Sequence, residues 1–211
     1  MPSTRPPLRT VLLDADGVLQ RRRPGLVRGL LRLGGPGFLY DAIRAEVGCL
    51  TDRRDFVDAL TEVIARHRLR ADPAAVARRW LHIAIDPARL DLVAELRAAG
   101  IRCGLATNQH RYRGTYMRDV LGLDAHFDAA FYSFERGLAK PDQAFFASIL
   151  DDLGDPAGAV LFLDDLPGNV VSARRLGIDA RLHLWRSGVA GLRRAVASRL
   201  PGTGPERGRP Q

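Results

Sequence analysis

Four short groups of polar residues, far apart along the chain, each follow a run of apolar residues. The groups are Asp14 with Asp16, Thr107 with Asn108, Lys140 alone, and Asp164 with Asp165. Asp, Asn and Thr favour turns and helix caps, so each group by itself has an ordinary structural explanation. Carboxylates, a hydroxyl and an ammonium gathered in one place would instead form a site for an anionic ligand, and the combination of all four groups favours that interpretation.

Lys140 is the most informative single residue, because the chain uses Arg at 31 of its 32 basic positions and Lys only here. This usage indicates that a compact ammonium serves a purpose at this position. A lysine acts as a point charge, which can bridge a carboxylate and a phosphate oxygen without the forked geometry of a guanidinium. A surface lysine beside a helix is the alternative explanation.

The four groups lie at the ends of predicted strands. Thr10 to Leu13 is a short, fully apolar strand, and Gly17 indicates a turn after Asp14 and Asp16. From residue 86 onward, apolar strands alternate with amphipathic helices. The predicted strands are Ile101–Ala106, Phe127–Ser133, Ala159–Asp164 and Ala180–Trp185, and the predicted helices are Asp86–Gly100, Tyr112–Leu121, Pro141–Leu153, Gly168–Leu176 and Val189–Leu200.

This alternation predicts an α/β fold, with a Rossmann-like parallel sheet covered by helices on both faces. Ligands bind such sheets beyond the carboxyl ends of the strands. All four polar groups are therefore expected at one edge of the sheet.

The segment from Gln20 to Ile85 shows no convincing strand and several helical patterns. The patterns are Phe38–Val47, Asp52–His67 with Phe56, Leu60, Val63 and Ile64 on one face, and Asp72–His82. We expect residues 20–85 to form a small all-helical cap, inserted into a catalytic core of residues 1–19 and 86–200. Residues 201–211, rich in Pro, Gly and Arg, are predicted to be a disordered tail.

The composition of 46% hydrophobic and 27% charged residues is that of an ordinary globular protein. The formal charge of +8 raises the question of nucleic-acid binding. The arginines are scattered as doublets, with Arg21–Arg23 the only longer run, and no aromatic residues are interleaved with them. This pattern favours solvated helix faces over a nucleic-acid interface.

The first residues, Met1 to Arg9, contain no apolar stretch of the kind found in a secretory signal. No hydrophobic run approaches the roughly 18 residues that span a bilayer. We therefore expect a cytoplasmic protein without a membrane partner. Cys49 and Cys103 match neither a disulfide framework nor a metal cluster, and are expected to be small buried hydrophobes.

The polar groups resemble, in order, the four motifs of the haloacid dehalogenase-like hydrolase superfamily. The matching segments are Asp14-Ala15-Asp16-Gly17-Val18-Leu19, Ala106-Thr107-Asn108, Lys140-Pro141, and Leu163-Asp164-Asp165-Leu166-Pro167-Gly168-Asn169. The resemblance spans nearly the whole core. The helical block after the first motif resembles the inserted cap of one large branch of that family.

The resemblance implies a role for each of these residues. Asp14 would be the nucleophile, and Asp16 would be the general acid and base, with its backbone carbonyl on the metal. Thr107 and the backbone N–H of Asn108 would bind the phosphoryl oxygens, and Lys140 would link the nucleophile to the phosphate. Asp165 would bind the metal directly, Asp164 would bind it through a water, and Asn169 would support that loop. The family often has a further aspartate where this chain has Asn169. The division of metal binding among the last three residues is therefore open.

The implied chemistry is hydrolysis of a small phosphate monoester, such as a sugar phosphate or nucleotide, through an aspartyl-phosphate. A carboxylate that approaches a phosphate dianion meets a repulsion of about 4 kcal/mol per unit pair at 4 Å and an effective dielectric of 20. Mg²⁺, which favours oxygen ligands, and Lys140 would offset that repulsion. Asp16 could then protonate the leaving group and later deprotonate a water.

Other activities use similar residues. A haloacid dehalogenase does not have an aspartate at the position of Asp16, and a phosphonate-cleaving relative would need a lysine in the cap. A sugar-phosphate mutase shares every core residue and stays open as an alternative. A receiver-type phosphoacceptor or an inactive binding relative would place its motifs in another order and would have no use for the cap.

The sequence identifies neither the substrate nor the oligomeric state. Substrate specificity should come from the cap, whose Arg21–Arg23 run and Gly34–Gly37 loop reveal no chemical identity. Arg21 to Arg23 could hold a second anionic group or form a solvated turn.

Overall fold

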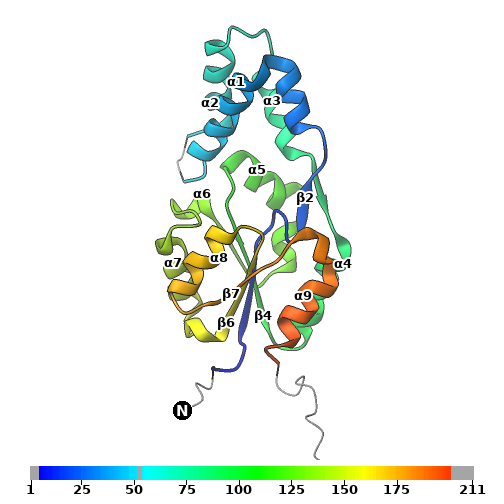
Figure 1. Cartoon of the computed structure of the whole chain (residues 1–211), viewed down its shortest axis with the longest axis vertical. Helices are drawn as coiled ribbons and strands as arrows, with labels where there is room; N and C mark the ends of the chain where they lie inside the picture. The colour runs from blue at the N-terminus through cyan, green and yellow to red at the C-terminus, as the bar shows by residue number, and fades with distance from the viewer. Residues whose placement is uncertain (1–4, 52–53, 201–211) are drawn as a thin grey trace, which may run out of the picture.

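A computed structural model describes residues 5–51 and 54–200. The molecule has two parts along its long axis (Figure 1). A larger part contains a central sheet, and three helices gather at the opposite end of the molecule. The carboxyl ends of the sheet strands face these helices, and the described start of the chain lies at the far end.

The central sheet has five parallel strands. They are β1 (Thr10–Leu13), β4 (Arg102–Thr107), β5 (Ala129–Tyr132), β6 (Val160–Asp164) and β7 (Asp179–Leu182), in the order β5-β4-β1-β6-β7. Leu13, the last residue of β1, pairs with Leu105 on one side and Leu163 on the other. The carboxyl ends of β1, β4 and β6 are therefore neighbours, with β1 in the middle.

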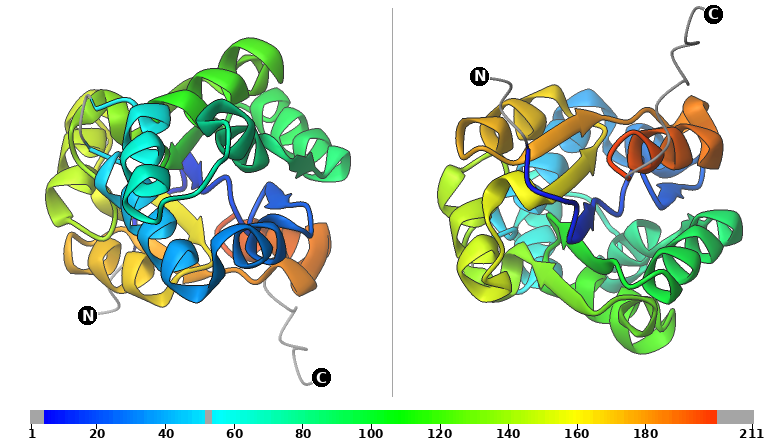
Figure 2. Two further views of the ribbon diagram at one scale, coloured as in Figure 1. Left: turned by 90° about the horizontal axis from the view of Figure 1, so that it is seen from above. Right: turned by 90° about the horizontal axis from the view of Figure 1, so that it is seen from below.

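Helices cover both faces of this sheet, as the end-on views show (Figure 2). Helices α4 (Pro87–Ala98) and α9 (Gly188–Ala197) pack on one face, and α7 (Gln143–Leu153) and α8 (Pro167–Arg175) on the other. Side chains alternate across β1 accordingly: Val11 and Leu13 belong to the first core and Leu12 to the second. The predicted α/β fold is confirmed.

The helical end of the molecule, which we call the cap, has its own apolar core. It contains α1 (Leu26–Gly48), α2 (Phe56–Arg66), α3 (Pro73–Ala77) and the 3₁₀ turn η1 (Arg78–Leu81). The predicted apolar face of α2 is buried in this core, beside Trp80. Asp72 caps α3 through the N–H groups of Ala74 and Ala75, at 3.1 Å each.

The predicted loop at residues 34–37 is wrong. These residues lie inside α1, where only Gly35 leaves the helical conformation, with φ of 74° and ψ of −170°. The chain therefore bends at Gly35 and continues as a helix with Pro36 in its new first turn. Helix α1 accordingly begins at Leu26, well before the predicted start at Phe38.

Two short strands join the cap to the core, and the expectation of no strand in residues 20–85 is wrong. Strands β2 (Gln20–Arg22) and β3 (Ile83–Ile85) pair antiparallel, with Gln20 opposite Ile85. Three residues each are too few to produce a period-2 pattern that could be recognised in the sequence. Arg21 and Arg22 thus lie on a strand, and not in the turn that was the alternative for them.

The remaining elements are short, and the sequence predicted only the first two of them. They are α5 (Arg111–Thr115), the π-helical turn η2 (Tyr116–Val120), η3 (Leu123–His126), α6 (Ser133–Arg136), η4 (Ala157–Ala159) and η5 (Trp185–Ser187). The predicted helix 112–121 is thus α5 followed by η2. The last strand ends at Leu182, before the predicted Trp185.

Both cysteines are buried, as expected, and no disulfide joins them. Within residues 5–51 and 54–200, no helix has the length and apolar character needed to cross a bilayer. The predicted disordered tail, 201–211, lies outside the described residues.

Candidate active site

The polar groups identified in the sequence lie at the carboxyl ends of three neighbouring strands and on the loop before α7. Asp14 follows β1, Thr107 ends β4, and Asp164 ends β6. The backbone N–H of Asp14 donates to Leu163 O at 3.0 Å, which extends the pairing of β1 with β6 to the first carboxylate. The parallel register thus brings residues 150 positions apart in the chain into contact.

Lys140 lies between two of the carboxylates. Its Nζ is 2.8 Å from Asp14 Oδ1 and 2.7 Å from Asp164 Oδ2, and it also donates to Ala106 O at 2.8 Å. The three acceptors match the three hydrogens of an ammonium. The Lys140 side chain is 1% exposed, and the two carboxylates hold its pKa above the usual value against the effect of burial.

Asp164 is fully buried, and both of its oxygens accept hydrogen bonds. Asn169 Nδ2 lies 3.0 Å from each oxygen, and the backbone N–H of Leu166 donates to Oδ1 at 2.8 Å. With the Lys140 contact added, most of its lone pairs are occupied by the protein. Asp164 is thus held rigidly in place, and Asn169 on α8 is one of the residues that hold it.

Asp14, Asp164 and Asp165 each offer a carboxylate oxygen, and these three oxygens lie within 4.8 Å of one another. Burial raises the pKa of Asp14 to about 7, which Lys140 opposes and Asp164 reinforces. Burial and Asp164 also raise the pKa of Asp165. The raised pKa values indicate that the negative charge of these crowded carboxylates is not fully neutralised by the protein. Their hard oxygen donors suit a magnesium ion. The residues present therefore fit a divalent cation.

Gly17 makes room for Asp165. Its φ is 76°, a conformation that L-residues other than glycine rarely adopt, and a Cβ on Gly17 would collide with the Asp165 carboxylate. The glycine after the first two aspartates therefore allows the loop after β1 to approach the loop after β6.

Thr107 and Asn108 contact different parts of the site. The Thr107 hydroxyl is buried and accepts a hydrogen bond from Gln109 Nε2 at 3.0 Å. The Asn108 side chain pairs with the backbone of Lys140, through Nδ2 to O at 2.7 Å and Lys140 N to Oδ1 at 2.9 Å. Asn108 therefore fixes the loop that presents the lysine.

Asp16 lies apart from the three-carboxylate cluster and is bound by side chains that the sequence did not identify. Arg113 binds both of its oxygens, with Nη2–Oδ1 at 2.8 Å and a second contact from Nη1 to Oδ2. Gln20 Nε2 and Gln109 Nε2 donate to the same carboxylate at 3.2 and 3.3 Å. The Arg113 guanidinium outweighs the effect of burial and keeps the pKa of Asp16 well below its usual range.

A signal for Gln109 and Arg113 was present in their spacing. They are four residues apart, directly after Thr107-Asn108, and Gln109 lies just before the helix α5 that carries Arg113. In a chain with 31 arginines, one more arginine did not stand out.

A cavity of about 320 Å³ opens over these residues, and almost all of the residues that line it have polar or charged side chains. The lining residues are Asp14, Asp16, Gly17, Arg21, Arg22, Thr107, Asn108, Lys140, Asp165, Leu166 and Asn169. Asp165 thus borders the cavity, whereas Asp164 does not. Arg22 pairs with Glu46 of the cap, and Arg21 lies over the ring of Trp185 at 5.6 Å.

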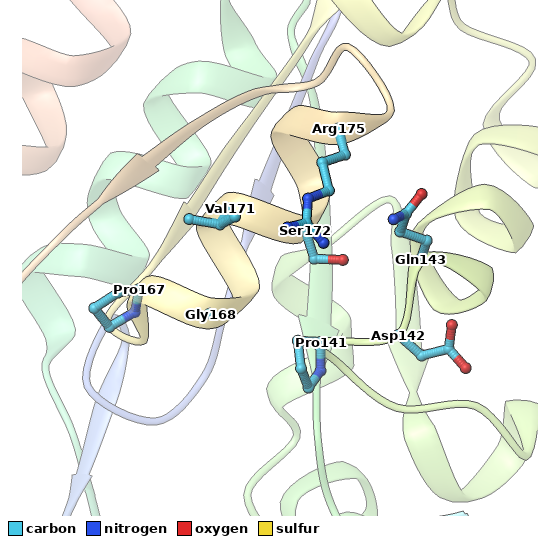
Figure 3. A pocket seen from close by; sticks show the side chains of 8 residues that line it. All are labelled: Pro141, Asp142, Gln143, Pro167, Gly168, Val171, Ser172 and Arg175. Atoms are coloured by element: carbon cyan, nitrogen blue, oxygen red, sulfur yellow. The ribbon is translucent and has the colours of Figure 1, made fainter.

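A larger hollow of about 560 Å³ lies between the start of α7 and the length of α8 (Figure 3). Its carboxylate, Asp142, caps α7 by accepting from Ala144 N at 2.9 Å, and the view shows it pointing away from α8. Pro141 and Pro167 line this hollow, whereas Lys140 and Asp165 do not. The hollow therefore lacks the grouped carboxylates of the smaller cavity.

Comparisons with known proteins agree with this geometry. A HAD family enzyme from Bacteroides thetaiotaomicron, solved as a magnesium complex, superposes with a TM-score of 0.79 over 90% of this chain and 100% of that one, at 17% identity. A phosphoglycolate phosphatase from Rhodospirillum rubrum is 28% identical over 185 residues, 81% of this chain and 77% of that protein.

A drimenol cyclase from Aspergillus calidoustus matches over 56 residues at 48% identity, which is 26% of this chain and 11% of the cyclase. That match covers one segment of a much longer protein. The family model described as haloacid dehalogenase-like hydrolase matches residues 8–177, a range that includes the cap and all four polar groups. The strand order, the carboxylate cluster and this match together establish that the chain belongs to the haloacid dehalogenase-like hydrolases.

Proposed function

We propose that this hydrolase is a magnesium-dependent phosphatase that acts on a small, polar phosphate monoester. The observation that carries the proposal is the position of the Lys140 ammonium, 2.8 Å from Asp14 and 2.7 Å from Asp164, at the wall of a polar cavity. An ammonium held beside a carboxylate offsets the repulsion between that carboxylate and an incoming phosphate dianion.

Asp14 is the proposed nucleophile. It ends the central strand, it borders the cavity, and one of its oxygens is fixed by Lys140. Its attack on phosphorus forms an aspartyl-phosphate and releases the alcohol of the ester. Water then attacks the phosphorus, which restores the Asp14 carboxylate and yields inorganic phosphate.

Asp16 is the proposed proton-transfer group. It borders the same cavity two residues after Asp14, and its side chain is 31% exposed. It gives a proton to the departing alkoxide and takes one from the attacking water, so both halves of the cycle use it. Thr107 and the backbone N–H of Asn108 are the proposed donors to the phosphoryl oxygens.

Asp14, Asp165 and the backbone carbonyl of Asp16 are the proposed magnesium ligands. Both oxygens of Asp164 already accept hydrogen bonds from the protein, which supports a role through a bridging water. Asp165 borders the cavity and is better placed for direct binding. When bound, the ion would supply positive charge that screens the phosphate from the nucleophile.

The cavity also supports a limit on the substrate. Leu166 is the single apolar side chain of any size among its lining residues, and Arg21 and Arg22 border it from the cap side. A volume of about 320 Å³ lined by charged and polar residues suits a small hydrophilic ester, such as a sugar phosphate.

The proposal is tested by phosphate release from a panel of phosphorylated metabolites and from p-nitrophenyl phosphate, with Mg²⁺ and with EDTA. We expect Mg²⁺-dependent release, fastest from a small hydrophilic ester. Conversion of a sugar phosphate into its isomer without release would identify a mutase instead. A stable acyl phosphate on Asp14 without turnover would identify a phosphoacceptor.

A further inference from the structure

Arg113 connects the cap to Asp16. Its side chain is 1% exposed, and its guanidinium makes contacts in three directions. The two Nη atoms bind the oxygens of Asp16, and Nη1 also donates to Gln109 Oε1 at 2.7 Å. The remaining donor, Nε, lies 3.0 Å from the backbone carbonyl of Trp80. A planar guanidinium cannot move at one of these contacts without moving at the others.

The two ends of this contact belong to different parts of the molecule. Arg113 lies on α5 in the core, and Asp16 lies on the loop after β1. Trp80 lies on η1 of the cap, fully buried against Phe56 of α2. The position of η1 therefore fixes Nε of the guanidinium, and the two Nη atoms of the same group fix the Asp16 carboxylate.

The surroundings of this contact contain buried polar atoms without partners. Among the described residues, Trp80 Nε1, both ring nitrogens of His110 and Gln20 Oε1 are buried and form no hydrogen bond. His110 packs against Phe56 of the cap at 4.0 Å between ring centroids. Unpaired buried polar atoms weaken an interface. The cap is thus held less firmly here than a fully paired interface would hold it.

We propose that Arg113 is a positioning residue that makes the orientation of the Asp16 carboxylate depend on the seating of the cap. The proposal rests on the proposed function, because it assigns Asp16 the proton-transfer role. With η1 seated, the fork of Arg113 holds Asp16 at the wall of the cavity. Displacement of η1 removes the Nε contact and frees the guanidinium to rotate, which releases Asp16 from that orientation.

The first test separates the two halves of the cycle. Arg113→Lys keeps the positive charge beside Asp16 but removes the fork, because one ammonium cannot span both Asp16 oxygens and the Trp80 carbonyl. p-Nitrophenolate departs without a proton, so its release in the first turnover does not depend on Asp16, whereas water attack on the aspartyl-phosphate needs the Asp16 carboxylate as a base. General base catalysis contributes about 10²–10⁴-fold, so the variant should lose roughly 100-fold in steady-state kcat on p-nitrophenyl phosphate and under roughly 10-fold in the first-turnover release of p-nitrophenolate.

Arg118→Gln is the matched control for this test. It removes an arginine five residues further on that pairs with Asp124 and Glu135, remote from Asp16. The control should lose equally little in the first turnover and in the steady state. Equal losses in the two phases for Arg113→Lys would overturn the proposal. If the wild-type protein released no phosphate from p-nitrophenyl phosphate, the proposed function would fail instead.

The second test needs neither substrate nor metal. The chain has two tryptophans, so Trp185→Phe leaves Trp80 as a fluorescent reporter on the cap. Coupling between two sites is reciprocal. Asp16→Ala should therefore shift the Trp80 emission in this background, and the same substitution should cause no further shift when Arg113→Lys is present. An unchanged emission in Asp16→Ala, or equal shifts with and without Arg113→Lys, would contradict the coupling.

Discussion

Lys140 Nζ and Asp14 Oδ1 lie 2.8 Å apart in a place where both side chains are almost completely shielded from water. Removal of one partner of such a buried ion pair strongly destabilises the folded protein, because the remaining charge is left uncompensated. Here the pair is also shared with Asp164. The Lys140 ammonium thus reduces the repulsion between the Asp14 and Asp164 carboxylates. Asp14 still borders the cavity.

We expect Lys140→Arg to lose activity in spite of its conserved charge. The ammonium lies among three oxygens in a buried space, and a guanidinium would displace at least one of them. Removal of one preorganised donor typically costs about 10²–10³-fold in kcat, and we expect a loss in that range. Steady-state kinetics with saturating Mg²⁺ measure it, and circular dichroism verifies the fold. Wild-type kcat in this variant would show that Lys140 does not contact the reacting groups.

Asn169→Ala should weaken metal binding more than it weakens folding. Asn169 Nδ2 holds both oxygens of Asp164, and loss of such an outer contact typically lowers metal affinity about 10–100-fold. We expect the Mg²⁺ concentration for half-maximal activity to rise by that factor. Ser172→Ala, on the same helix, is the control and should leave the Mg²⁺ dependence unchanged. An unaltered Mg²⁺ titration for Asn169→Ala would exclude the supporting role.

His110 is expected to reduce stability at low pH. Burial, together with Arg113 and Arg22, lowers the pKa of His110 to about 3 from 6.5. A histidine with a depressed folded-state pKa takes up protons more readily when unfolded, so its contribution is fully present above the unfolded pKa. Stability should therefore fall as the pH decreases from about 6.5 toward 3.

His110→Phe tests that expectation, because it keeps the ring contact with Phe56 and removes the two unpaired nitrogens. We expect the free energy of unfolding to rise by about 1 kcal/mol at pH 7, and by more at pH 5. Urea denaturation at the two pH values provides the measurement. An equal change at both pH values would mean that the ring of His110 is not held neutral by its surroundings.

The sequence predicted those parts of the fold that depend on long, regular patterns. The apolar run Thr10–Leu13 is β1 without a change at either end, and the predicted apolar face of α2 is the buried one. Asp86, followed by a proline, predicted a helix start. In the structure its carboxylate caps α4 as expected, by accepting from Ala88 N at 3.2 Å.

Features that depend on long-range contacts were missed. Strands β2 and β3 are three residues each and owe their pairing to the position of the cap. The bend at Gly35 does not end α1, because the helix resumes at once on the far side. The partnership of Arg113 with Asp16 spans 97 positions, and no local pattern indicates which of 31 arginines reaches the site.

The most direct test of the account is the rate of phosphate release by Asp14→Asn, compared with the wild-type protein and with Asp151→Asn, which changes an exposed carboxylate on α7. With Mg²⁺ present, we predict that Asp14→Asn loses at least about 10³-fold in kcat while it keeps the wild-type circular dichroism, because an amide cannot act as the nucleophile. Asp151→Asn should behave as the wild type does. Near-normal turnover by Asp14→Asn would contradict the account.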